Sequence, residues 1–373
     1  MQSSKEIRVA SRSVPQKLVW CFRVALAFLL AVVVWEVLLS QLVLQKPTSQ
    51  SHPVLGRIYG EGLYVQGKEG YGRTVLNELG LRSRPLETAL EGQQRVLVLG
   101  DSYTQAMQVS DEVAFPQRLN DLLGDNTRVI NSGREGASPA DYIALEEYNK
   151  TTFQPDVVVV QLNEADFTRD LLSNKQTFYY EETSQGYNLR ENKSVVSSNA
   201  LASRFADLQS VFNFSVVRVA LERVEAMRKG EPVPTPEVQT TSQQSDGSLE
   251  HFIVGELKQA YQHPILLYIP EMDYFSPDYA QPRATEQYLA DAAQKLGVTF
   301  ISLRPDFVAL YRNQNRTAHG FNNTQPGMGH INPLGHEIAA ERLAQVLGPQ
   351  VANSSTADER LSINTFATRR TNQ

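Results

Sequence analysis

The chain offers a serine for nucleophilic chemistry at the end of a short apolar segment. Residues 95–100 (RVLVLG) form a continuous apolar run, which is typical of a strand buried on both faces of a parallel sheet. Asp101 and Ser102 follow it directly. A serine at such a turn lies near the N-terminus of the next helix, where backbone N–H groups favour an anion. Ser102 is therefore a candidate nucleophile, although an ordinary helix cap is the simpler interpretation of a single serine.

Two later residues could donate hydrogen bonds to the oxyanion that such an attack creates. Gly136 lies in VINSGREGAS (129–138), where the lack of a side chain would let a backbone N–H approach a substrate carbonyl oxygen. Asn163 follows the apolar run at 157–162. Each residue also has an ordinary interpretation, a loop glycine and a turn residue at a strand end.

A histidine near the end of the chain could act as the base. His330 lies in GHINPLGHEIAA (329–340), just before the last predicted helix. Its ordinary pKa near neutrality suits it to take a proton from Ser102. His336, near the start of that helix, is more simply explained by capping or packing.

In this order, the four segments resemble the SGNH (GDSL-type) hydrolase superfamily. The segment GDSYTQAMQVSDEVAFPQRL (100–119) is similar to bacterial members, and the resemblance covers roughly residues 94–170 and 264–347. It implies a flavodoxin-like fold and ester hydrolysis or acyl transfer. It also implies that Ser102 is the nucleophile and His330 the base. The oxyanion hole would then consist of the backbone N–H groups of Ser102 and Gly136 and the side chain of Asn163.

The chain departs from this family where the third catalytic residue is expected. The family has an Asp two or three residues before the histidine, whereas residues 325–328 are Q-P-G-M. An acid normally orients the imidazole and stabilises the imidazolium. Three explanations remain open: a Ser–His dyad oriented by a backbone carbonyl, an acid from elsewhere such as Asp306, or a degenerate site.

The elements that must position these residues alternate along the chain. Further apolar runs predict strands at 128–130, 156–162, 264–269 and 298–303, and amphipathic patterns predict helices at 111–123, 138–149, 284–296 and 335–347. This alternation predicts a three-layer α/β domain over 94–347 with a mostly parallel sheet. The segment 171–262 breaks the alternation and is predicted to be a helical insertion or cap, with helices around 200–228 and 249–262 joined by a polar linker.

The N-terminal region predicts a membrane anchor. Residues 18–44 are almost wholly apolar, and the 18 residues from Leu18 to Trp35 would extend about 27 Å as a helix, close to the thickness of a bilayer core. No A-x-A cleavage pattern follows, so we predict an uncleaved transmembrane signal anchor. Four basic residues before the span predict a cytoplasmic lead over 1–17 and a periplasmic or other extracytoplasmic location for the rest. Residues 45–93 are predicted to form a linker and a small β-rich preamble, and 348–373 a flexible tail.

Composition excludes several functions. The chain has 35 Lys and Arg against 41 Asp and Glu, and the part after Glu36 carries thirty of the former and thirty-nine of the latter. This acidic balance argues against a nucleic-acid partner. The only cysteine, Cys21, lies in the predicted span, and His52, His251, His263 and His319 are scattered without ligand spacing. We therefore expect no disulfide, no metal site and no cofactor. The sequence does not determine the oligomeric state.

Together these features predict a membrane-anchored serine esterase or deacylase that acts outside the cytoplasm through Ser102 and His330. Its substrates would be acyl esters, including O-acetyl esters, of glycans or small molecules. An O-acyltransferase acting on an envelope or exopolysaccharide glycan would share the same nucleophile. A catalytically degenerate glycan-binding or scaffold protein is the third hypothesis, because the usual acid is missing.

Overall fold

The computed structural model describes residues 15–42, 49–52, 54–67, 69–83, 92–174, 176–184, 186–192, 228 and 246–349. Several predictions lie outside these residues. They are most of the cytoplasmic lead, the helix around 200–228 apart from residue 228, the linker after it, and the tail beyond 349.

The centre of the molecule is a parallel sheet of five strands. These are β5 (Gln94–Gly100), β6 (Thr127–Gly133), β7 (Val157–Leu162), β10 (Ile265–Tyr268) and β11 (Thr299–Ser302). Their spatial order is β11-β10-β7-β5-β6, and every neighbouring pair is parallel. This is the doubly wound order of flavodoxin-like folds, in which the direction of winding reverses beside the first strand. The predicted fold class is therefore confirmed.

Helices cover both faces of this sheet. One face packs on α4 (Pro139–Ala144), α5 (Glu146–Phe153), α9 (Ser248–Tyr261) and α10 (Ala284–Leu296). The other packs on α3 (Phe115–Leu123), α11 (Arg304–Gln314) and a last helix over 333–349. Along β5, Leu97 and Leu99 lie in the first apolar core, whereas Val96 and Val98 lie in the second. Successive side chains of a strand point to opposite faces, so a continuous apolar run serves both cores.

The insertion predicted over residues 171–262 does not include its last helix, α9, which belongs to the main domain. Helix α9 was assigned to an insertion over 171–262, but its residues Ile253, Val254 and Leu257 are buried in the main core beside α10. It is the crossover helix between β7 and β10, as parallel strands require. The other described parts of this segment begin after the short helical turn η3 (Asp166–Asp170) and include an antiparallel hairpin, β8 (Phe178–Thr183) and β9 (Gly186–Glu191).

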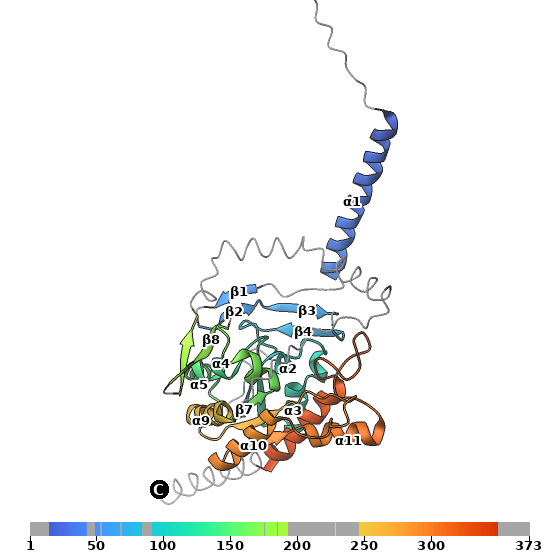
Figure 1. The fold of residues 1–373 in the computed structure, drawn as a ribbon. Helices are drawn as coiled ribbons and strands as arrows, with labels where there is room; N and C mark the ends of the chain where they lie inside the picture. The colour runs from blue at the N-terminus through green and yellow to red at the C-terminus, as the bar shows by residue number, and fades with distance from the viewer. Residues whose placement is uncertain are drawn as a thin grey trace, which may run out of the picture.

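The region before the domain forms two antiparallel strand pairs. Strands β1 (Ser49–His52) and β2 (Gly56–Tyr59) make one, and β3 (Gly62–Gln66) and β4 (Gly72–Leu76) make the other. Figure 1 shows both pairs lying across one end of the α/β domain. They are joined to it by Arg82, whose buried guanidinium donates to the carbonyl groups of Gln105, Ala106 and Val109 and pairs with Asp111 at 2.7 Å. Hydrogen bonds from Arg82 therefore hold the preamble against the loop that follows residue 105.

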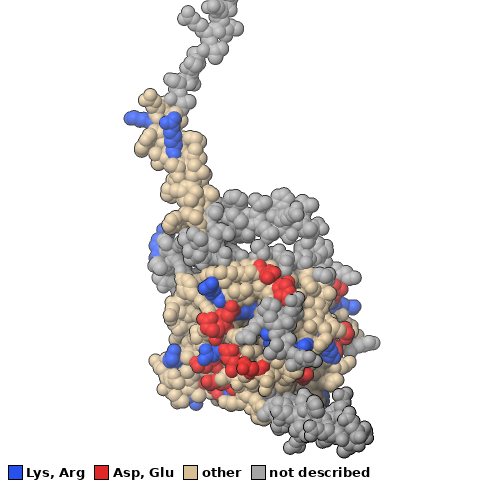
Figure 2. Space-filling view, turned by 180° about the vertical axis from the view of Figure 1, so that it is seen from behind, with Lys and Arg blue, Asp and Glu red and all other residues tan. Residues whose placement is uncertain are grey.

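Helix α1 (Gln16–Leu42) precedes these strands. Its segment Gln16–Glu36 is the one helix within the described residues that is long and apolar enough to cross a membrane. Most of its described side chains are exposed, including Trp20 at 67% and Trp35 at 63%, whereas Glu36 is buried. Figure 2 shows the helix as a mostly uncharged rod whose Lys and Arg side chains lie toward its end distant from the domain, and it shows acidic side chains gathered on the visible face of the domain.

Candidate active site

Ser102 occupies the turn between β5 and the short helix α2 (Ser102–Gln105). Asp101 caps this helix, because its Oδ1 accepts a hydrogen bond of 2.9 Å from the N–H of Tyr103. The N–H of Ser102 is the first of the helix, and the first N–H groups of any helix have no partner within it. The nucleophile predicted from sequence thus stands at the carboxyl edge of the sheet, next to backbone donors.

His330 contacts this serine across a separation of 228 residues. Its Nε2 lies 2.8 Å from Ser102 Oγ, which is a hydrogen-bond distance. The ring also packs against Tyr103, with centroids 5.0 Å apart, and the Tyr103 hydroxyl donates to the carbonyl of Gly329. The structure therefore brings together the two residues that the sequence predicts to react.

The acid at the far side of the histidine is Glu69. Its Oε2 lies 2.6 Å from His330 Nδ1, and its Oε1 accepts the backbone N–H of His330 at 2.7 Å. The two oxygens together fix both the ring and the loop that carries it. Glu69 lies in the turn between β3 and β4, so the preamble supplies it. Sequence reasoning missed this residue, and the only signal pointing to it was the missing acid before His330.

The turn that carries Glu69 is fastened to the loop that precedes His330. Asn323 accepts a hydrogen bond from the N–H of Gly70 at 2.8 Å and donates to the carbonyls of Gly67 and Gly70. Gly329 has a φ of +81°, and a Cβ built there would lie 2.2 Å from Glu69 Oε1. A glycine is therefore required at 329 both by the backbone conformation and by the approach of the carboxylate.

Asp306, the acid suggested from sequence, does not take this position. Its Oδ2 accepts a hydrogen bond of 2.9 Å from Arg342 Nε, which joins α11 to the last helix. The far nitrogen of His330 is already bonded to Glu69. The arrangement also differs from a dyad oriented by a backbone carbonyl, because the group on Nδ1 is a carboxylate.

The surroundings of His330 alter its proton affinity. Burial, the largest single influence, acts to lower its pKa, but the hydrogen bond and the negative charge of Glu69, together with the charges of Asp101 and Glu135, outweigh it. The pKa of His330 is therefore raised above its ordinary value. A carboxylate in this position favours the imidazolium, which is the form that a general base produces when it takes a proton.

Asn163 contacts the carboxylate oxygen of Asp101 that does not cap the helix. Its Nδ2 donates to Asp101 Oδ2 at 2.7 Å, and its Oδ1 accepts the N–H of Ala165 at 2.8 Å. A carboxamide has two N–H donors, so one remains for a ligand. Burial raises the pKa of Asp101, although the hydrogen bonds from Tyr103 and Asn163 oppose this.

Gly136 lies in a turn at the end of β6. The N–H of Ala137 donates to the carbonyl of Arg134 at 3.0 Å, and Gly136, with a φ of +74°, fills the position of this turn that favours glycine. The N–H of Arg134 donates to the carbonyl of Gly100 at 3.0 Å and so ties the turn to the end of β5. The turns after β5, β6 and β7 thus meet where the sheet changes its direction of winding, which is where doubly wound folds bind ligands.

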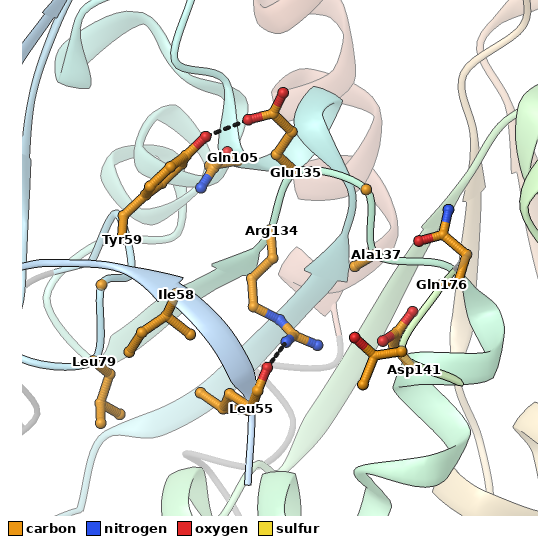
Figure 3. Close-up of a pocket in the computed structure, with 13 residues that line it drawn as sticks. Leu55, Ile58, Tyr59, Leu79, Gln105, Arg134, Glu135, Ala137, Asp141 and Gln176 are labelled. Atoms are coloured by element: carbon orange, nitrogen blue, oxygen red, sulfur yellow. Dashed lines mark hydrogen bonds between the residues drawn. The ribbon is translucent and has the colours of Figure 1, made fainter. Parts of the chain in front are cut away.

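Two cavities are lined by residues close in sequence to Ser102, Gly136 or His330. The first has a volume of about 340 Å³ and is lined by Gly136 and Gln105 of the domain and by residues of the preamble, among them Leu55, Ile58 and Tyr59. Figure 3 shows this cavity with Arg134 at its centre. The second measures about 290 Å³ and includes Tyr103, Phe275, Met328 and Gly329. The second cavity thus includes the residues directly adjacent in sequence to Ser102 and to His330, whereas the first includes Gly136.

The remaining buried histidines have other surroundings. His336 Nδ1 accepts the N–H of Phe115 at 3.3 Å, and the two rings stack, which is the packing role expected of it. His319 packs against Phe307, and burial, followed by the charge of His330, lowers its pKa to about 3. Within the described residues, no three His, Cys, Asp or Glu side chains are grouped as metal ligands.

No protein-family model matches the chain, and no curated protein matches it. Solved structures resemble it in outline. A catalytic mutant of an acetylxylan esterase from Geobacillus stearothermophilus is 14% identical, with a TM-score of 0.38 over 69% of this chain and 96% of that chain. A carbohydrate acetylesterase from Sinorhizobium meliloti is 10% identical, with a TM-score of 0.35 over 69% and 100%. An α/β hydrolase enzyme from the metagenome of Lake Arreo is 13% identical, with a TM-score of 0.36 over 69% and 97%.

Proposed function

We propose that this protein is an ester hydrolase of the SGNH type in which Ser102 is the nucleophile, His330 the general base and Glu69 the residue that orients His330. One observation carries this proposal: a continuous line of hydrogen bonds runs from Ser102 Oγ through both ring nitrogens of His330 to the Glu69 carboxylate, at 2.8 and 2.6 Å. A nucleophile, a base within hydrogen-bond reach and a third group that orients the base are the combination that covalent catalysis requires.

The reaction follows from these positions. Ser102 Oγ attacks the ester carbonyl carbon while its proton passes to His330 Nε2. The imidazolium is stabilised by Glu69 and then gives the proton to the departing alcohol, leaving an acyl-serine. Water then attacks this acyl group, with His330 again acting as the base, and the carboxylic acid is released. Glu69 stays ionised throughout and holds the proton of His330 on Nδ1.

The negative oxygen of the tetrahedral intermediate would be bound by three donors. We assign these to the N–H groups of Ser102 and Gly136 and to the free N–H of the Asn163 side chain. Asp101 supports two of them, because it caps the helix that begins at Ser102 and holds the Asn163 amide at 2.7 Å. Removing a single donor of this kind typically lowers kcat by about 10²–10³.

We also propose that helix α1 anchors the enzyme and that the domain acts outside the cytoplasm. The helix is long and apolar enough to span a bilayer, and the basic residues that precede its apolar core favour a cytoplasmic N-terminus. The substrates of such an enzyme would be acyl esters, including O-acetyl esters, of surface glycans or of small molecules.

Acyl transfer is a second candidate, and the cavity on the His330 side favours it. That cavity of about 290 Å³ lies next to Tyr103 and Gly329, where an acceptor hydroxyl could replace water. The third hypothesis, a degenerate scaffold, rests on the missing acid before His330, and the contact of Glu69 with His330 Nδ1 favours the two catalytic proposals over it.

Replacing Ser102 with Ala tests the proposal. The full-length protein in detergent micelles is assayed on p-nitrophenyl acetate and labelled with a fluorophosphonate probe, and a methyl glycoside is added to detect transfer. Ser248→Ala is the matched control, because the Ser248 hydroxyl is hydrogen-bonded to the Tyr187 hydroxyl. We expect Ser102→Ala to lose both hydrolysis and labelling. Equal activity in Ser102→Ala and the control would refute the assignment.

A further inference from the structure

The cavity of about 340 Å³ contains a cation that the catalytic steps above do not use. Arg134 belongs to the turn that carries Gly136, and its backbone N–H is bonded to the carbonyl of Gly100. Its position relative to the nucleophile is therefore fixed at the main chain. Figure 3 shows its side chain extending from the end of β6 into the cavity, between Leu55 and Asp141.

The guanidinium of Arg134 is poorly satisfied by the protein. Among the described residues its one hydrogen-bond partner is the carbonyl of Leu55, at 3.3 Å. Two acids lie nearby. Glu135 accepts the hydroxyl of Tyr59, and Asp141 Oδ2 accepts the N–H and the hydroxyl of Ser138. The positive charge of Arg134 also acts on Asp141, where it opposes the rise in pKa that burial causes, but the two side chains share no hydrogen bond. A guanidinium has five N–H donors, so most of them are available to a ligand.

The walls of the cavity increase the strength of any contact with that cation. Leu55, Ile58, Leu79 and Ala137 form an apolar surface beside Arg134. Charge–charge attraction is stronger next to such a surface than in water. The planar fork of arginine matches the two oxygens of a carboxylate. Glu135 and Asp141 add negative charge to the lining, which weakens the binding of every anion and weakens that of a dianion such as phosphate more than that of a singly charged carboxylate.

The size and polar groups of the cavity indicate what carries the carboxylate. A volume of about 340 Å³ is at the lower end of the range for small-molecule sites and is larger than an acetyl group requires. The side chains of Gln105, Gln176 and Thr177 provide hydrogen-bonding groups around its edge. This combination suits one sugar ring with several hydroxyl groups and one acid.

We propose that this cavity binds the alcohol part of the ester and that this part is an acidic sugar whose carboxylate pairs with Arg134. The substrate class would be O-acylated uronic acids, as single residues or within a glycan. The inference rests on the proposed esterase function. Gly136 lines the same cavity, so a sugar held by Arg134 would lie beside one of the three assigned oxyanion donors.

The test compares two mono-acetylated methyl glycosides that differ only at C6, the glucuronoside and the glucoside. We expect the wild-type full-length protein in micelles to prefer the glucuronoside in kcat/KM by about tenfold or more, the gain typical of a charge-assisted bidentate contact. Arg134→Gln should remove this preference by lowering kcat/KM for the glucuronoside about tenfold more than for the glucoside. Arg134→Lys should keep part of the preference. Arg118→Gln, which breaks a surface pair with Glu337, is the matched control and should keep all of it.

Binding measurements separate failure of this inference from failure of the esterase proposal. In Ser102→Ala protein, calorimetry with methyl glucuronoside, methyl glucoside and methyl glucoside 6-phosphate reports the cavity without catalysis. Binding of the glucuronoside that Arg134→Gln abolishes would support the subsite even if no ester were hydrolysed. Equal binding of the acid and the neutral sugar, tighter binding of the phosphate, or equal loss on all substrates in Arg134→Gln would overturn it.

Discussion

Replacing Glu69 with Gln should abolish the proposed esterase activity without disturbing the fold. Glu69 uses both oxygens, one for the backbone N–H of His330 at 2.7 Å and one for its Nδ1 at 2.6 Å. Glutamine has the same shape and can keep only one of these contacts as an acceptor. Its oxygen would hold the backbone N–H, and its NH₂ would then face Nδ1. The ring nitrogen must accept that hydrogen bond, so the proton of a neutral His330 moves to Nε2, where it blocks proton transfer from Ser102.

The size of the effect follows from this change of tautomer. In a serine protease triad, replacing the acid by its amide lowers kcat about 10⁴-fold, because the imidazole is held in the wrong tautomer. At about 1.36 kcal/mol for each factor of ten, this corresponds to roughly 5 kcal/mol of transition-state stabilisation. We expect Glu69→Gln to lose about 10³- to 10⁴-fold in kcat on p-nitrophenyl acetate, with a thermal unfolding midpoint close to that of wild type.

The matched control is Asp306→Asn, the same kind of substitution at the acid that pairs with Arg342. It should stay within about twofold of wild type, since a half-exposed ion pair contributes little. A second variant, Glu69→Ala, leaves space for a small carboxylate, and formate should restore part of its activity. Glu69→Gln with activity within about threefold of wild type, or Asp306→Asn with the larger loss, would refute the role of Glu69.

Three further outcomes are expected. Because Glu69 raises the pKa of His330 and the base must be neutral, the acid limb of the kcat/KM profile should lie above pH 6.5 in wild type; a limb at or below 6.5 would contradict the pairing. Gly329→Ala should lower kcat at least tenfold, because its Cβ would displace the Glu69 carboxylate, while leaving fluorophosphonate binding to Ser102 measurable. The buried His319 has a folded pKa of about 3 against 6.5 when unfolded, so the unfolded chain binds the extra proton and stability is lost as pH falls below 6.5. Between pH 7 and pH 5, the free energy of unfolding measured by urea denaturation should therefore fall in wild type by roughly 2 kcal/mol more than in His319→Phe.

The fold could be predicted largely from local pattern. Continuous apolar runs such as 95–100 and 157–162 indicate strands buried on both faces, and these runs coincide with β5 and β7. The helix α9 shows where pattern was insufficient. Its sequence correctly indicated a helix, but whether that helix belongs to a cap or to the main layer depends on which face it buries, and that is decided by residues far away in the chain.

Some residues of the candidate site could likewise be placed from local pattern, and one could not. Ser102 and Asn163 follow recognisable strands, and parallel strands bring their ends to one edge of the sheet, so their proximity could be anticipated. Glu69 could not be found by this logic. It lies in a five-residue turn between two short strands that belong to a different sheet, and 261 positions separate it from its partner. No local periodicity relates a turn in one sheet to a loop beside another.

Because the preamble supplies Glu69, the order in which the chain is synthesised and folds determines when the proposed catalytic site is complete. The acid comes from position 69, the nucleophile from 102 and the base from 330, so the line of hydrogen bonds joins segments made early and late in synthesis. A chain that has emerged only as far as Asn163 would hold the acid, the serine and the oxyanion donors but no base. Contacts between such distant segments form late in folding, because the loop they close is long. Under the proposed function, a chain still lacking the segment around His330 would be catalytically silent, and activity would arise only when the two ends of the folded domain meet.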